Sequence, residues 1–135
     1  MRRAYRLAFS LVVLLSLGSC ASTGGIPKNP FGDITVPETF LPYSDQWLFI
    51  KSPRVTAAKL VYMTQLDTEG AVAAVRAALA KDGWAPQAVN RGVSRDGFTM
   101  VTVDFTKGRD SCRATVIEGA NATHVDLAVA RLTTE

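Results

Sequence analysis

The sequence predicts an α+β domain, an antiparallel β-sheet with one α-helix packed on one face, in the order β-β-α-β-β-β-β. Apolar residues recur at helical spacing in one stretch, between residues 67 and 83. Three stretches nearer the C-terminus alternate apolar and polar residues, as half-buried strands do. Short turns separate these stretches, and strands joined by short turns lie antiparallel.

Two strands are predicted before the helix. Residues 46–51 are an apolar run, and residues 59–66 are rich in residues that favour strands. In the preceding segment, 34–43, Pro37 and Pro42 exclude a helix interior and a central strand. We expect that segment to be extended chain packing over the domain.

The helix is predicted to begin after Asp67 or Thr68, because either side chain can cap its N-terminus. It is predicted to end near Asp82, with Gly83 as the C-cap. Its buried face is expected to carry the residues at i, i+3 and i+7, which are Val72, Val75 and Leu79.

Four strands are predicted after the helix. Residues 84–93 can form only an edge strand, because Pro86 has no backbone N–H to donate. The other three are residues 98–107, 111–118 and 123–132. Their alternation places Cys112 on the inward face and His124 on the outward face.

The N-terminus has the organisation of an export signal. Arg2, Arg3 and Arg6 form a positive region, and an apolar stretch follows from Leu7 to Leu17. That stretch is too short to span a membrane, which takes about 20 residues, and suits a signal peptide. The next residues, Leu17-Gly18-Ser19-Cys20, resemble the lipobox of bacterial lipoproteins.

This resemblance implies that a diacylglycerol is transferred to the Cys20 thiol, that the chain is cleaved between Ser19 and Cys20, and that the new terminus is N-acylated. Two or three acyl chains would hold the protein on a membrane almost permanently. Ala21, rather than aspartate, implies by the same resemblance the outer membrane, with the domain facing the periplasm. The alternatives are an ordinary secretory signal near a cysteine and a buried N-terminal helix.

The chain is therefore predicted to have three parts: a signal peptide (1–19), a lipidated flexible tether (20–33) and a single α+β domain (34–135). The tether is predicted from its Gly, Pro, Ser, Thr and Asn content. In the alternative interpretation, Ile26 and Phe31 dock on a partner or on the edge of the domain.

Charge restricts the partners. Without the three signal-peptide arginines, the net charge of +3 falls to about zero. A nucleic-acid partner is not expected, because it would require a basic patch. Near-neutrality also argues against strong electrostatic attachment to anionic lipid.

The mature part also resembles a group of uncharacterised small lipoproteins from sulfate-reducing and related bacteria. The resemblance rests on Asp82-Gly83-Trp84, on Val103-Asp104-Phe105 with Lys107 and Cys112, and on Thr123-His124-Val125. In that group Asn is expected where this chain has Asp82. The resemblance implies the fold and adds no chemistry.

The sequence predicts neither an enzyme nor a cofactor or metal site. Metal sites need clustered ligands, and the chain has one histidine, His124, and one cysteine besides Cys20, Cys112. Three interpretations of Cys112 remain open: a small core residue, half of an intermolecular disulfide, or a catalytic partner of His124.

The expected function is that of a membrane-anchored envelope lipoprotein that binds a protein partner or supports an assembly. Candidate surfaces are the edge around residues 84–93, which can accept a partner strand, and the residues Phe40, Tyr43 and Trp84. The other interpretation of Trp84 is a core residue that covers the end of the helix. The alternative is a module that binds a small apolar ligand or cell-wall fragment between helix and sheet, against Trp84, Tyr62 or Met100.

Overall fold

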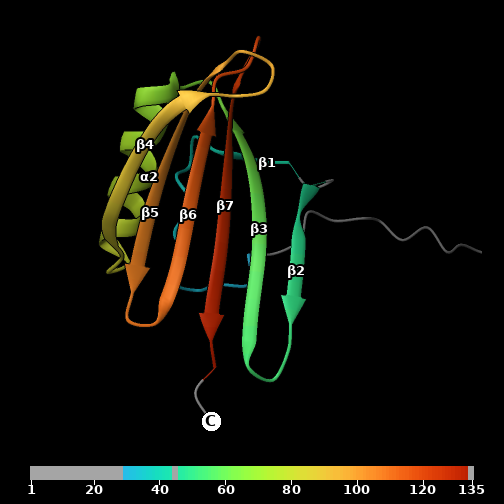
Figure 1. Cartoon of the computed structure of the whole chain (residues 1–135), viewed down its shortest axis with the longest axis vertical. Helices are drawn as coiled ribbons and strands as arrows, with labels where there is room; N and C mark the ends of the chain where they lie inside the picture. Colours follow the sequence, from blue (N-terminus) through green and yellow to red (C-terminus); the bar gives the residue numbers. More distant parts are fainter. Residues whose placement is uncertain (1–28, 44–45, 134–135) are drawn as a thin grey trace, which may run out of the picture.

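A computed structural model describes residues 29–43 and 46–133. It is a seven-stranded antiparallel sheet with one helix, α2 (Thr68–Lys81), against one face, which confirms the predicted fold class (Figure 1). The strands are β1 (Leu41–Pro42), β2 (Leu48–Lys51), β3 (Val55–Thr64), β4 (Ala85–Val93), β5 (Thr99–Lys107), β6 (Asp110–Ile117) and β7 (Thr123–Leu132). Their order is β1-β3-β7-β6-β5-β4, and β2 also pairs with β3.

The helix forms where its sequence predicts, with Asp82 rather than Gly83 as the C-cap. The Asp67 side chain accepts a hydrogen bond from the Gly70 backbone N–H at 2.7 Å and so caps the N-terminus. After the last turn Gly83 takes a φ of +84°, which a residue with a Cβ adopts only at a cost. The predicted residues Val72, Val75 and Leu79 are buried against the sheet.

Two details of the strands differ from the prediction. The strand expected at 59–66 begins at Val55, because the Ser52 N–H bonds to the Val55 carbonyl and closes a tight β2–β3 hairpin. A two-residue strand, β1, was not predicted, and it pairs with β3 at Met63 and Tyr62. The sequence pattern missed it because so short a strand has no periodicity.

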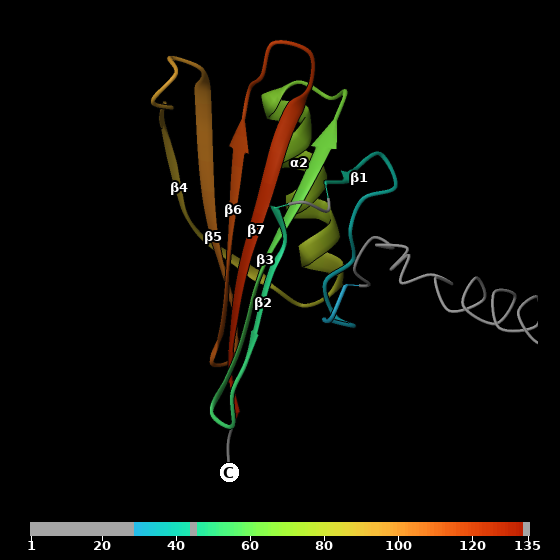
Figure 2. The same ribbon diagram turned by 90° about the vertical axis from the view of Figure 1, so that its right-hand side faces the viewer.

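The core lies between the helix and the sheet. Alternate residues of the four central strands fill it, as the sequence pattern predicted for β5, β6 and β7: Ala58, Leu60, Tyr62, Val101, Val103, Phe105, Cys112, Ala114, Val116, Val125, Leu127 and Val129. Phe31, Ile34 and Phe40 join them from the N-terminal segment, and Trp84 joins them from the end of the helix. Figure 2 shows this segment and α2 on the same side of the sheet.

The strands run between two ends of the domain. The upper end in Figure 1 holds the turns at 65–67, 94–98 and 118–122. The lower end holds the hairpin tip at 52–54, the turn around Gly108 and the end of β7. We keep the names upper end and lower end below.

A polar cluster, which we call the Asp33 clamp, fixes the N-terminal segment at the lower end. The Asp33 carboxylate accepts hydrogen bonds from Lys107 Nζ at 2.8 Å and from the Arg131 guanidinium, which also lies over the Phe31 ring. The Asp33 carbonyl accepts a bond from Trp84 Nε1 at 2.9 Å. Burial by itself would raise the pKa of Asp33, but the bonds from Lys107 and Arg131 outweigh it and lower that pKa.

The prediction of a flexible tether is therefore wrong for residues 29–33. Phe31 is buried in the core, rather than at the domain edge as the alternative interpretation expected, and Asp33 is held by the clamp. Ile26 lies outside the described residues. The packed part thus includes residues before 34, the predicted boundary. The rest of the tether, the signal peptide and the Ser19–Cys20 cleavage and lipidation site lie outside the described residues.

Candidate binding surface

The sheet face opposite α2 has a hollow of about 560 Å³ in its lower half. Two rows of cross-strand neighbours form it. One row is Leu48, Lys59, Ala128, Arg113 and Asp104, and the row below it is Ile50, Ala57, Ala130, Ser111 and Thr106. Small side chains in the middle of each row leave a depression between longer side chains at its ends.

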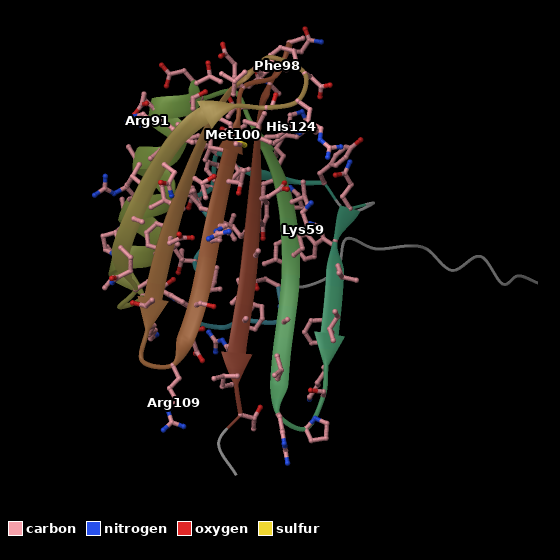
Figure 3. All side chains as sticks on the ribbon, in the orientation of Figure 1. Lys59, Arg91, Phe98, Met100, Arg109 and His124 are labelled. Carbon is pink, nitrogen blue, oxygen red and sulfur yellow. The ribbon has the colours of Figure 1, made fainter. Side chains whose placement is uncertain are left out.

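Two ion pairs border the hollow. Lys59 Nζ lies 2.9 Å from Asp126, and Figure 3 shows Lys59 on this face. Arg113 donates two hydrogen bonds to Asp104, at 2.7 and 3.2 Å. These bonds hold the pKa of Asp104 below its usual value. The charged side chains at the border pair with each other. The exposed apolar surface inside the hollow is therefore the part that a bound molecule would cover.

The edge strand β2 forms one wall of the hollow and exposes apolar side chains. Leu48, Phe49 and Ile50 are 55%, 52% and 52% exposed, and the described residues offer β2 no pairing partner other than β3. In an antiparallel pair, every second residue of a strand bonds to its neighbour strand. The Ser52 N–H bonds to Val55, so the backbone N–H and C=O of Phe49 and Lys51 point away from β3. An apolar edge with free backbone groups is a template for another strand.

The second edge strand, β4, was the edge expected to accept a partner. Its position at the edge and its exposure agree with the prediction. Pro86 lacks an N–H, however, and the pairing with β5 shifts register between Pro86 and Val89. Arg91 adds a charge, paired with Glu69 at 3.1 Å. Prolines and bulges protect edges against pairing, and β2, which has a charge at Lys51, contains neither, so β2 is the more favourable edge.

The residues predicted as a partner or ligand surface do not form one. Phe40 and Trp84 are 4% and 2% exposed, because both complete the core. Tyr43 is half-buried, and its ring meets the His124 ring edge-on at 6.4 Å between centroids. Tyr62 is also buried in the core, so the expected ligand site between helix and sheet is filled. Met100 lies on the opposite face, near the upper end (Figure 3).

Cys112 and His124 are not brought together. Cys112 pairs with Val129 and faces the core, whereas His124 pairs with Ile117 nearer the upper end. Burial raises the pKa of the Cys112 thiol to about 12, with a smaller contribution from the charge of Asp104. Cys112 is therefore a core residue, and in this fold it is accessible neither for catalysis nor for an intermolecular disulfide.

We expect Cys112 to be unreactive towards a thiol reagent in the folded protein. With a pKa of about 12, only about one thiol in ten thousand is ionised at pH 8, and burial blocks access as well. The rate of labelling should rise at least about a thousandfold on unfolding. A Ser111→Cys, Cys112→Ser variant is the control, because its exposed thiol should react at once. Fast labelling of folded wild type would contradict this assignment.

Among the described residues, no group of three His, Cys, Asp or Glu side chains could hold a metal ion. Within residues 29–43 and 46–133, no helix has the length and apolar character needed to cross a membrane. No protein-family model matches the chain, and neither does any curated protein or solved structure.

Proposed function

We propose that this chain is a bacterial envelope lipoprotein, anchored in the outer membrane through acyl chains on Cys20, whose domain is a non-catalytic module that binds a partner protein. The anchor is supported by the positive N-terminus, the short apolar stretch and the lipobox-like residues 17–20. The single observation that carries the binding role is the free apolar edge of β2 beside the hollow.

The partner segment that this surface fits is an extended, apolar strand. Its backbone would bond to the outward N–H and C=O groups of Phe49 and Lys51. Alternate side chains of an added strand point to the same face, so one or two of them would lie towards the hollow, against Leu48 and Ile50. Main-chain bonds would supply affinity and the hollow would supply selectivity.

The test is co-purification of the tagged protein from crosslinked native membranes, beside a Cys20→Ser variant. We expect one partner in near-equal amount with wild type and loss of that partner with Cys20→Ser. Membrane retention of wild type without any partner would leave the anchor standing and rule out the protein-binding role.

A second candidate is a small apolar ligand bound in the hollow, whose volume lies within the usual range for ligand sites. Ala128→Phe would test it, because Ala128 is exposed and a larger side chain there fills the hollow without crowding the core. Mass spectrometry of the gently purified protein should then show a bound apolar compound with wild type and none with Ala128→Phe.

A further inference from the structure

Positive charge without a partner gathers at the lower end. Lys51, Arg54 and Arg109 form no salt bridge with another residue of the described ranges. They lie at the end of β2, in the hairpin tip and in the β5–β6 turn, where Figure 3 labels Arg109. At this end the Asp33 carboxylate is bonded to Lys107 and Arg131, and Asp110 lies 3.6 Å from Arg131 Nε. Asp82 accepts hydrogen bonds from Thr35, and Lys81 is a further cation without a salt bridge among the described residues. Among the described residues, the lower end therefore carries excess positive charge.

The upper end carries acidic residues instead. Asp67, Asp96 and Glu118 lie in its three turns, and none forms a salt bridge within the part of the chain that the structure covers. Arg95 offsets only part of this negative charge. The mature chain is neutral overall, but its positive and negative charges are thus separated between the two ends of the domain.

The N-terminal segment also passes the lower end at Asp33, and Asn29, the first described residue, lies further up, beside Phe40, Trp47 and Tyr62. The clamp holds Asp33 against Lys107 and Arg131, which are at the lower ends of β5 and β7. The eight residues between Cys20 and Asn29 span at most about 30 Å when fully extended. An anchor on Cys20 would therefore hold the domain within about 30 Å of the lipid surface, close enough for the lower end to touch it.

We propose that the lower end docks on anionic phospholipid headgroups through Lys51, Arg54 and Arg109, with the strands upright on the membrane. This rests on the lipid anchor proposed above. Exposed Leu132, at the same end, adds an apolar contact at the interface. Each cation at an anionic surface strengthens attachment about fivefold. In this orientation the β2 edge and the hollow face sideways, open to a partner.

The test compares the depths of two labels in the lipidated mature protein. Pro53→Cys places a fluorophore at the lower end and Ala120→Cys places one at the upper end, both in exposed turns. Cys112 is buried and the Cys20 sulfur would carry lipid, so each variant takes one label. The protein is reconstituted in phosphatidylglycerol–phosphatidylethanolamine vesicles that carry a headgroup quencher, and recovered by flotation.

Because the ten-residue strand β3 is about 33 Å long, the two labels should differ clearly in depth. We expect strong quenching at position 53, little at 120, and loss of this difference in phosphatidylcholine vesicles or at high salt. Lys51→Glu, Arg54→Glu, Arg109→Glu together should also abolish the difference. The control triple Arg76→Glu, Arg91→Glu, Arg95→Glu changes the net charge equally, away from the lower end, and should preserve it.

Equal quenching of both labels in protein that floats with the vesicles would overturn the docking and leave the anchor intact. Failure of the wild type to float with the vesicles would contradict the proposed lipid anchor, and therefore also the docking that rests on it.

Discussion

Ile50→Glu is expected to weaken capture of the partner about thirtyfold while leaving the domain folded. Ile50 lies on the free edge and lines the hollow, so a partner segment would bury it. A charge buried there without a counter-ion costs at least as much as removing a central interface residue, about 2 kcal/mol. Because Ile50 is half exposed in the free domain, the unfolding free energy should change by less than about 0.5 kcal/mol.

The matched control is Val89→Glu, which adds the same charge to an exposed aliphatic position on the other edge strand, β4. Capture by this variant should equal that of wild type. Weaker capture of the partner with Val89→Glu but not with Ile50→Glu would show that the partner binds β4 instead of β2.

Two substitutions of Phe49 distinguish a partner that pairs with the backbone of β2 from one that contacts only its side chains. Its N–H points away from β3, so Phe49→Pro removes an outward donor without breaking the β2–β3 ladder. Phe49→Ala removes the same ring and keeps the donor. Capture should be weaker with proline than with alanine, and equal capture would mean that the partner does not pair with the backbone of β2.

Asp33→Asn is expected to lower the unfolding free energy by about 2 kcal/mol, and the melting temperature by about 10 °C. The change removes the carboxylate that neutralises Lys107 and Arg131, two partly buried cations, and loosens the N-terminal segment. Thermal unfolding followed by circular dichroism measures it. Asp96→Asn, in an exposed turn without a salt bridge among the described residues, is the control and should change little.

The effect of Asp33→Asn should depend on pH in a known direction. The pKa of Asp33 is lower in the folded protein than its ordinary value of 3.8. Its stabilising contribution is therefore complete above about pH 4 and is lost as the pH falls through the lowered pKa. The difference between wild type and variant should shrink in acid. A difference that is unchanged in acid would show that the charge of Asp33 is not what stabilises the segment.

Local patterns predicted most of the fold. The alternation in residues 98–107, with Val101, Val103 and Phe105 inward, is a property of neighbouring residues and can be read without the rest of the chain. The helix likewise carries its own cap at Asp67 and its own stop at Gly83.

The clamp and the candidate surface could not be predicted in this way. Asp33 meets residues 74 and 98 positions further along the chain, and no local pattern encodes such pairs. The hollow depends on the strand register, which pairs Ala57 with Ala130 and places Ala128 in the neighbouring row. Phe40 was considered a surface residue because it lies near the predicted tether, and Trp84 because it follows the helix end at Gly83, whereas their rings fill the core.

The most direct test of the proposed binding edge is site-specific photo-crosslinking in native membranes. A photoreactive amino acid replaces Phe49 on β2 or, in a second variant, Val89 on β4; both positions are exposed. The proposed function predicts one discrete crosslinked protein from position 49 and none from position 89. A product from position 89 alone, or none from either position, would contradict the assignment of β2 as the binding edge.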